Sequence, residues 1–388
     1  MPNSGPLTGI RVVGLEHSVA GPLCTRILSD MGADVIKVER PGGGDFARHW
    51  DHNANGEGAQ FWWLNRGKRS IALDLKEPRD RAVFDSLLDR ADVFVCNLSP
   101  AGAVRLGLAD PSFDARFPSL VSCQISGYGR SGSLRDRKAY DMLVQAESGI
   151  MSLTGTPAQP TRTGVSVCDV GAGIYAAALV LAAVIEQRRT GRGRRLDVAM
   201  MDAALEFVAP MLVSYANAGV IYERVPQHHH AIAPYGVFHC RDGEGILIAI
   251  EQNREWGLLC ERLLGDARLA DDPRYSTNSA RISNREAVDK MVADALRALD
   301  LSTIAALFDE MGLAYGVLNS MAEVVDHPVV QERGALRTVA ARRGGDVKTL
   351  IGVGERLFAA DSEPSPPPEL DQHRGEILEE LGHDRRSL

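Results

Sequence analysis

The sequence has no CxxC pair among its six cysteines, which stand at positions 24, 96, 123, 168, 240 and 260 of 388 residues. Structural zinc sites and redox dithiols use closely spaced thiols, so neither is indicated. Several of these cysteines lie in apolar runs, where a buried free thiol is the usual state. Free thiols are typical of a reducing compartment, and we therefore expect a cytoplasmic protein.

Positive charge is also scarce, because 43 Lys and Arg residues face 51 Asp and Glu residues and leave a net charge of -8. Nucleic acids and anionic membranes need an excess of positive potential, so we expect neither as a partner. The first residues, Met1 to Gly5, lack the basic and then apolar pattern of an export signal. The longest apolar run, Ala172 to Ile185, is short for a membrane span and predicts a buried helix.

The common phosphate-binding motifs are missing as well. Residues 16–22, which follow the first predicted strand, lack the GxGxxG pattern, and the chain has no GxxxxGK[ST] P-loop. His228, His229 and His230 are consecutive, and three consecutive side chains on a helix or strand cannot all point at one metal ion. We expect no metal and no permanently bound cofactor.

What the first part of the chain does have is an alternation of short β-branched runs with helical segments. Strands are predicted at 10–15, 34–38, 70–75, 92–96 and 120–126, with helices at 22–31 and 79–90. Such alternation is typical of a parallel sheet with helices on both faces. The fold class is therefore α/β, with a Rossmann-like large domain.

The texture of the sequence changes near Pro226. Two predicted strands, 236–238 and 245–249, are followed by helices out to Ala322, which indicates a smaller α+β domain over 226–322. We expect the large domain to begin with residues 1–215 and to be completed by a return over 335–388. That return has a strand-like run at 335–340 and a final helix at 374–381.

The most informative residue is Asp169, which joins the strand-like run 165–168 to an alanine-rich helix. One interpretation is a helix N-cap, since an Asp oxygen accepts the free amide hydrogens of a first turn. The other is a nucleophile. A carboxylate at the positive end of a helix stays ionised, and small neighbours such as Gly171, Ala172 and Gly173 leave room for a ligand. Residue pattern alone leaves both open.

Ordered motifs along almost the whole chain resemble the class III CoA-transferases, the formyl-CoA transferase or CaiB/BaiF type. Each motif is weak alone, and their shared order is what identifies the family. They are Leu7–Val13, Ala20-Gly21-Pro22, Gly32–Pro41, Asn65–Lys76, Ser126–Gly129, Lys138–Asp141, Thr190–Gly193, Asp197–Ala199 and Gly375–Leu378.

The resemblance implies that Asp169 attacks an acyl-CoA thioester to form a mixed anhydride, and that an aspartyl-CoA thioester follows. A free carboxylic acid then takes the CoA. Backbone amides near Gly171 are expected to stabilise the oxyanions. The resemblance also implies an interlaced homodimer, with each chain threaded through the other.

The family's CoA site carries over residue by residue, and several of its members are cations, as the phosphates of CoA require in an acidic protein. The implied CoA-binding residues are His17, Ser18, Val19, Ala20, Arg40, Leu73, Lys76, Asn97, Leu98, Ser99, Arg105, Lys138, Ala139 and Tyr140. We expect the nearby basic run of Arg66, Lys68 and Arg69 to make at most a minor contribution to CoA binding.

For the acyl pocket we expect His228, His229, His230, Glu251 and Gln252. Residues 251–254 stand where formyl-CoA transferases carry a run of glycines, which argues against formate or oxalate as substrate. The cationic candidates, which are the three histidines and Arg254, favour a small dicarboxylate, with succinyl-CoA as donor.

Two other functions remain open. Related CoA-ester racemases and epimerases carry Gly-His-Asp where this chain has Ala139-Tyr140-Asp141, so the usual second base for proton transfer is replaced by tyrosine. A non-catalytic CoA-binding protein would keep the fold without turnover.

Overall fold

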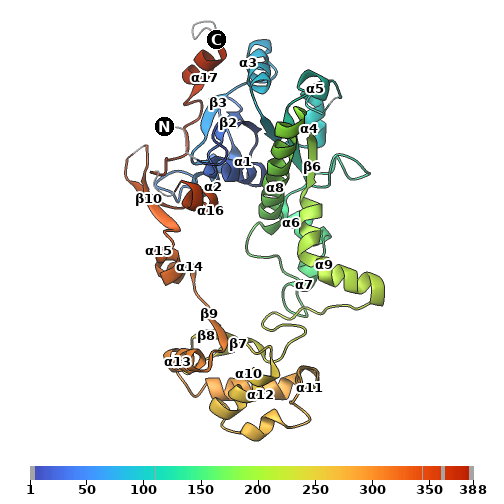
Figure 1. The fold of residues 1–388 in the computed structure, drawn as a ribbon, viewed down its shortest axis with the longest axis vertical. Helices are drawn as coiled ribbons and strands as arrows, with labels where there is room; N and C mark the ends of the chain where they lie inside the picture. The colour runs from blue at the N-terminus through green and yellow to red at the C-terminus, as the bar shows by residue number, and fades with distance from the viewer. Residues whose placement is uncertain (1–4, 110, 343, 360–362, 384–388) are drawn as a thin grey trace. The chain divides into compact units, whose positions relative to one another are not determined.

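The computed structural model describes residues 5–109, 111–342, 344–359 and 363–383. The chain divides into two compact units. The larger unit comprises residues 1–150, 162–216 and 328–388, and the smaller unit comprises residues 151–161 and 217–327. Figure 1 shows the course of the chain, coloured from the N-terminus to the C-terminus.

A six-stranded parallel sheet forms the centre of the larger unit. Its strands lie in the order β3-β2-β1-β4-β5-β6, and every neighbouring pair is parallel. This is the doubly wound order, in which ligands bind at the carboxyl ends of the strands. The strands are β1 (Arg11–Leu15), β2 (Asp34–Glu39), β3 (Arg69–Ala72), β4 (Val93–Cys96), β5 (Val121–Ser126) and β6 (Arg195–Ala199). The predicted fold class is confirmed.

Helices cover both faces of this sheet. On one face, α1 packs against α8 and against the strands. On the other, side chains of α3, α4, α5 and α17 share one hydrophobic core with the sheet. The helices of the larger unit up to residue 218 are α1 (Ala20–Asp30), α2 (Ala59–Asn65), α3 (Pro78–Asp89), α4 (Pro100–Arg105), α5 (Pro111–Arg116), α6 (Asp141–Glu147), α7 (Ile150–Leu153, which crosses into the smaller unit), α8 (Val167–Thr190) and α9 (Met200–Ala218), with a 3₁₀ turn η1 (Phe46–Arg48).

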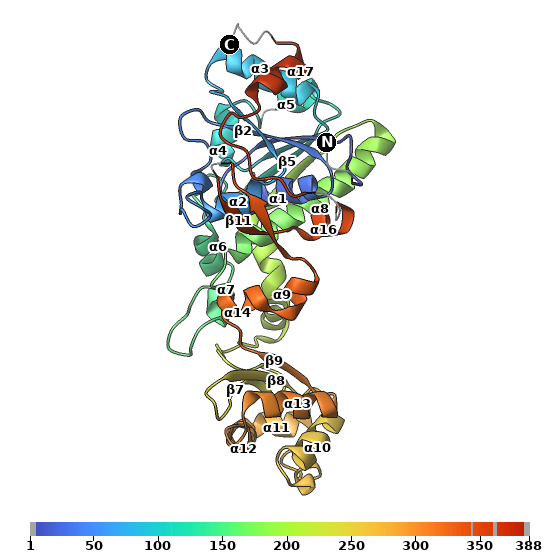
Figure 2. The same ribbon diagram turned by 90° about the vertical axis from the view of Figure 1, so that its left-hand side faces the viewer.

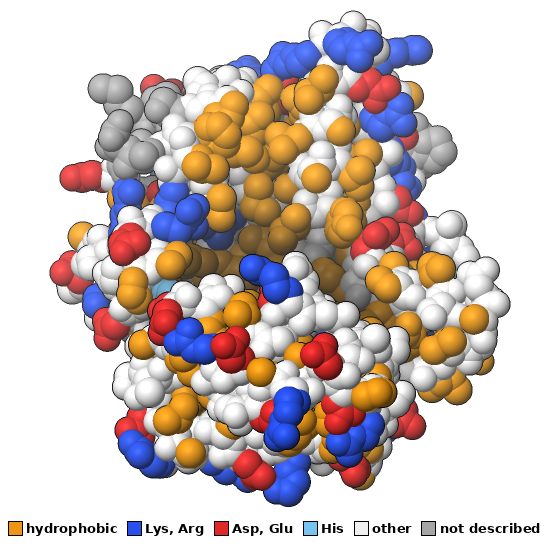
Figure 3. All heavy atoms as spheres, turned by 60° about the horizontal axis from the view of Figure 1, so that its bottom comes forward, with side chains coloured by type: hydrophobic (Ala, Val, Ile, Leu, Met, Phe, Trp, Pro, Cys, Tyr) orange, Lys and Arg blue, Asp and Glu red, His pale blue; other side chains and the backbone are white. Residues whose placement is uncertain are grey.

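Helix α8 is longer than the predicted apolar run. By length and composition alone it is long and apolar enough to span a membrane, and half of its apolar window is buried. The buried side packs on α1 and β5. The other side exposes Ile174, Tyr175 and Leu179, and the neighbouring α9 exposes Phe207 and Val213. Figure 3 shows hydrophobic side chains gathered in one broad area of the surface.

The chain returns to the larger unit through α15 (Pro328–Glu332), the antiparallel hairpin β10 (Leu336–Ala340) and β11 (Asp346–Leu350), α16 (Val353–Phe358) and α17 (Arg374–Leu381). Helix α17 lies beside α3 in both ribbon views (Figures 1 and 2). Its Ile377 is fully buried, and Glu380 pairs with Arg69 at 2.7 Å. The final helix therefore completes the core of the sheet, and its predicted bounds are confirmed.

The smaller unit is built on the antiparallel sheet β7 (Tyr235–His239), β8 (Gly245–Ala249) and β9 (Ala314–Val317). Trp256, Leu259, Val292 and Phe308 lie in the hydrophobic core that this sheet shares with its helices. The helical elements of this unit are α10 (Asn253–Arg262), η2 (Ala267–Ala270), α11 (Asn278–Ser283), α12 (Arg285–Leu296), α13 (Leu301–Met311) and α14 (Met321–Asp326).

Candidate active site

Asp169 lies in the first turn of α8 rather than at its cap. The helix begins at Val167. Ser166 holds the N-cap position, but its side chain makes no capping hydrogen bond. Two predictions are therefore wrong. Residues 165–168 form no strand, because Val167 and Cys168 already belong to the helix. Asp169 is not the N-cap, because it is the third residue of the helix.

The cap of α8 comes instead from Asp141, which opens α6. One oxygen of Asp141, Oδ1, accepts hydrogen bonds from the backbone amides of Cys168 at 2.8 Å and Asp169 at 3.2 Å. The other, Oδ2, accepts from Nε2 of Gln145 at 2.6 Å. A carboxylate that bonds the free amides of a first turn stabilises the helix as an N-cap does. Sequence reasoning quoted Asp141 only as part of a motif and gave it no role.

Gln145, which is fully buried, fastens the loop before α8 to α6. Its Oε1 accepts from the amide of Thr163 at 2.9 Å, and its Nε2 donates to the carbonyl of Val165 at 3.2 Å. The loop and the first turn of α8 are thus both held by α6.

The pKa of Asp169 is raised to about 7, first by burial and second by the negative charge of Asp141. Burial and the charge of Asp141 therefore outweigh the helix dipole, which by itself would keep this carboxylate ionised. A carboxylate with a raised pKa is a stronger base, and a sizeable fraction of it remains ionised at neutral pH. Such tuning is typical of groups that react.

The small residues after Asp169 serve helix packing. Gly171, Ala172 and Gly173 are all buried. A Cβ on Gly173 would lie 2.9 Å from the carbonyl oxygen of Ala20, so glycine lets α8 approach the start of α1 closely. The expectation that these residues leave room for a ligand is wrong, because α1 and α9 occupy that space.

The same close approach places Asp169 near the loop that follows β1. Val170 packs against Val19 and Leu23 in one apolar cluster. Ala20 opens α1, so the first turns of α1 and α8 are neighbours. The candidate nucleophile and the candidate CoA loop therefore meet at the carboxyl end of the sheet.

The loop after β1 is fastened to the loop after β4. Oδ1 of Asn97 accepts from the amide of His17 at 3.0 Å, and Nδ2 of Asn97 donates to the carbonyl of His17 at 2.7 Å. The imidazole of His17 meets the ring of Phe46 edge-on at 5.4 Å, and burial lowers its pKa. The guanidinium of Arg40 lies over the ring of Phe46, 5.1 Å from the ring centroid.

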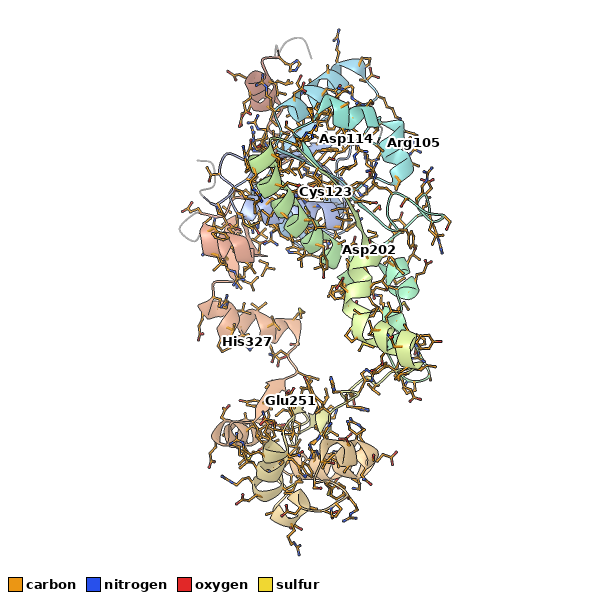
Figure 4. All side chains as sticks on the ribbon, turned by 45° about the vertical axis from the view of Figure 1, so that its right-hand side comes forward. Arg105, Asp114, Cys123, Asp202, Glu251 and His327 are labelled. Atoms are coloured by element: carbon orange, nitrogen blue, oxygen red, sulfur yellow. The ribbon has the colours of Figure 1, made fainter. Side chains whose placement is uncertain are left out.

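The remaining CoA candidates follow the carboxyl ends of neighbouring strands. Val19, Ala20 and Leu73 are buried. Leu98 and Ala139 are half-buried. Exposed candidates are Arg40, Lys76, Ser99, Arg105, Lys138 and Tyr140, and Figure 4 shows Arg105 at the end of α4.

The basic run before β3 is used inside the protein. Arg66 pairs with Glu355 at 2.8 Å, Lys68 with Glu16 at 2.8 Å, and Arg69 with Asp34 at 2.7 Å. Arg66 and Lys68 are buried, which leaves them a structural role.

In the smaller unit the three histidines have different neighbours. His228 forms an isolated β-bridge with Gly236. The ring of His229 stacks on that of Tyr235 with centroids 5.1 Å apart, and the ring of His230 meets that of Tyr222 edge-on at 5.3 Å. Among the described residues no group of three or more His, Cys, Asp or Glu side chains is arranged to hold a metal ion.

Glu251 and Gln252 are exposed and precede α10, and the first turn of that helix holds them. Oε2 of Glu255 accepts from the amides of Glu251 at 2.8 Å and Gln252 at 3.0 Å. Residues 251–252 are thus pinned to α10 by a capping box.

The chain is similar to CoA-transferases along nearly its whole length. The family described as CoA-transferase family III matches residues 7–374. A succinate–glutarate CoA-transferase of Agrobacterium fabrum is 36% identical over 98% of this chain and 97% of that protein. A succinyl-CoA:mesaconate CoA-transferase of Haloarcula hispanica is 34% identical over 97% of each. The solved structure of a CaiB/BaiF family protein from Brucella suis has a TM-score of 0.84 and 33% identity, covering 97% of this chain and 100% of that one.

Proposed function

The chain belongs to CoA-transferase family III, and on that premise we propose that it moves CoA from succinyl-CoA to a small dicarboxylic acid, with Asp169 as the nucleophile. One observation carries the proposal. Asp169 is a partly buried carboxylate with its pKa raised to about 7, held in the first turn of α8 beside the His17–Ala20 loop. The preference for dicarboxylates is supported by the succinate–glutarate and succinyl-CoA:mesaconate relatives.

The proposed reaction proceeds by two acyl exchanges at Asp169. A carboxylate oxygen of Asp169 attacks the thioester carbonyl of the donor, the carbon–sulfur bond breaks, and a mixed anhydride and CoA thiolate form. The thiolate attacks the aspartyl carbonyl and releases the donor acid, leaving an aspartyl-CoA thioester. The acceptor carboxylate then attacks that thioester, releases the CoA thiolate and forms a mixed anhydride with Asp169. The thiolate attacks the acceptor carbonyl of this anhydride, which forms the new acyl-CoA and regenerates the Asp169 carboxylate. Every attacking group is an anion, so no separate general base is needed.

The CoA moiety is proposed to bind at the carboxyl ends of β1 to β4. Arg40, Lys76, Arg105 and Lys138 are exposed cations with which its phosphates can pair. The acid is proposed to be recognised by one of His228, His229 and His230 together with residues 251–252. CoA and its thioesters are substrates here, not resident cofactors.

A hydroxylamine trap tests the nucleophile. The protein is incubated with succinyl-CoA and hydroxylamine, and mass spectrometry should find an aspartyl hydroxamate at Asp169. Asp169→Ala should abolish transfer and retain CoA binding. The matched control is Asp202→Ala, since Asp202 is likewise the third residue of a helix, α9, and is labelled in Figure 4. Undiminished transfer by Asp169→Ala would refute the mechanism.

The same incubation in deuterated water tests the racemase alternative. A CoA transferase leaves the hydrogens next to the thioester carbonyl in place, whereas a racemase exchanges one of them for deuterium. Tyr140, 70% exposed, holds the position of the racemase histidine. Deuterium uptake that depends on Asp169 would favour a racemase.

We further propose an interlaced homodimer in a reducing cytoplasm. The exposed apolar side chains on α8 and α9 are what a partner subunit would cover, and all six cysteines are buried free thiols. Light scattering after size exclusion should give twice the chain mass. Leu179→Arg and Val213→Arg together should shift that mass toward one chain, because each places a charge in the contact.

A further inference from the structure

A fully buried ion pair lies beneath the candidate CoA loop. The ammonium of Lys37, in the middle of β2, lies 2.8 Å from Oδ2 of Asp45 and donates to the carbonyl of Glu16 at 3.1 Å. Lys37 and Asp45 are both buried, with 0% and 2% of their surface exposed. Removing two charges from water is unfavourable unless each is well paired, so the loss of either partner leaves an uncompensated buried charge.

The other oxygen of Asp45 is used on the loop itself. Oδ1 accepts from the amide of Ser18 at 2.9 Å and from the amide of Ala47 at 3.0 Å. Ser18 has φ of 65°, the left-handed conformation that residues other than glycine seldom adopt. Such a conformation persists only where its surroundings hold it. The bond from Ser18 to Asp45 is one such restraint, and the two bonds between His17 and Asn97 are the neighbouring restraint.

Asp45 is itself held firmly. Its amide donates to Oε2 of Glu39 at 3.0 Å, and Glu39 is paired with Arg48 at 2.7 Å. Because Asp45 also begins the 3₁₀ turn that carries Phe46, one side chain fixes both the His17–Ser18 peptide and the ring that His17 and Arg40 contact.

We propose that Asp45 is a positioning residue for CoA: without touching the ligand, it holds the His17–Ala20 loop and the Phe46 turn in the arrangement that binds CoA. This inference rests on the proposed function, which places CoA at these loops. The cations at this edge attract the phosphates, and Asp45 sets the shape into which the ligand fits.

Three substitutions separate the roles of Asp45. Asp45→Asn keeps an oxygen that can accept from Ser18 and Ala47. Asp45→Ser keeps a cap for Ala47 but is too short to bond Ser18 and Lys37 as well. Asp45→Ala removes every acceptor. The matched control is Asp51→Ser, because Asp51 also accepts from two backbone amides, of Asn53 and Ala59, each at 2.9 Å.

The decisive measurement is the Kd of CoA by calorimetry, together with the KM of each substrate. Asp45→Ser and Asp45→Ala should raise the Kd of CoA and the KM of succinyl-CoA about tenfold or more, the effect of losing one charge-assisted hydrogen bond. The KM of the free acid and kcat at saturating succinyl-CoA should stay within about twofold. Folded Asp45→Asn keeps the acceptor for Ser18 but turns its Nδ2 toward the Lys37 ammonium, so it should lose less CoA affinity than Asp45→Ser without matching the unmodified protein. Asp51→Ser should match the unmodified protein.

Circular dichroism and thermal melting confirm that each variant is folded, and Asp45→Asn and Asp45→Ser provide the test if Asp45→Ala does not fold. Unchanged CoA affinity in folded Asp45→Ser would overturn the positioning role. So would an equal loss in kcat and in the KM of both substrates, which indicates general damage. If the unmodified protein neither binds CoA nor forms the Asp169 hydroxamate, the proposed function fails, and the positioning role fails with it.

Discussion

The carboxylate of Asp141 should control the pH at which the enzyme becomes active. In the proposed reaction Asp169 attacks as an anion, so the rate should rise with pH through its pKa of about 7 and reach a plateau above it. The ordinary pKa of Asp169 is 3.8, and burial is the larger cause of the rise and Asp141 the smaller. Asp141 therefore accounts for less than half of this rise. Its share of the rise is at most about 1.5 pH units.

The test variant is Asp141→Asn, which removes the charge and keeps one oxygen for the amides of Cys168 and Asp169. We expect the acid limb of the profile to move down by about one pH unit. At pH 5.5 the variant should then retain roughly eightfold more of its own plateau rate than the unmodified protein does. The plateau itself should fall, because the new Nδ2 of the asparagine would face Nε2 of Gln145, which now donates to Asp141.

The assay is kcat/KM for succinyl-CoA between pH 5.5 and 9, with the acceptor acid saturating. Asp202→Asn, which removes a carboxylate from the first turn of α9, is the control and should leave the profile in place. An acid limb that stays at pH 7 or moves upward in Asp141→Asn would refute the electrostatic reasoning.

Two further predictions concern stability. The folded-state pKa of Asp169 lies above its unfolded value, so its ionisation destabilises the fold above pH 7 and this effect disappears below about pH 4. Asp169→Asn should therefore raise the unfolding free energy at pH 8 by about 2 kcal/mol, after a discount for partial exposure, and change it little at pH 4. Urea titration at the two pH values measures both changes. Gly173→Ala should lower the unfolding free energy by about 1–3 kcal/mol, because its Cβ would lie 2.9 Å from the Ala20 carbonyl oxygen. Gly257→Ala is the matched control in a helix, with its nearest neighbour at 3.9 Å, and should be neutral or stabilising. A pH-independent gain in the first case, or equal effects of the two alanines in the second, would contradict these expectations.

Five of the six strands of the central sheet were predictable because they are short apolar runs separated by clear helical segments. Predicted strands such as 92–96 and 120–126 differ from β4 and β5 by one residue. The sixth strand of this sheet, β6, was not predicted, and neither were the hairpin strand β11 and the edge strand β9. All three are short, and β9 has no fully buried residue, so it lacks the strong apolar signal of a core strand.

The run 165–168 shows why local pattern failed at the site. Its β-branched composition favours a strand, yet Val167 and Cys168 form the first turn of α8. The cap that begins this helix comes from Asp141, a residue 27 positions earlier than Cys168. No window centred on Asp169 contains that cap, so pattern alone could assign the capping role only to Asp169 itself.

Lys37 and Asp45 show a second limit of sequence reasoning. A lysine inside the apolar strand 34–38 signals a buried ion pair, because an unpaired ammonium there would be strongly destabilising. The sequence does not show which carboxylate forms the ion pair with this lysine. Asp45 and Glu16 both lie near, at 2.8 and 3.6 Å, and only the folded backbone shows that Asp45 also bonds Ser18.

Asp141 and Asp45 do comparable work on the two sides of the site. Each is a carboxylate that accepts hydrogen bonds from two backbone amides. Asp141 bonds those of Cys168 and Asp169 at the start of α8, and Asp45 bonds that of Ser18 in the loop after β1 and that of Ala47 in its own 3₁₀ turn. They differ in charge balance. Asp45 is paired with the ammonium of Lys37, whereas Asp141 bonds amide groups alone and its negative charge raises the pKa of Asp169. For this reason we expect Asp45 to govern how tightly CoA binds, and Asp141 to govern the pH at which Asp169 can react with it.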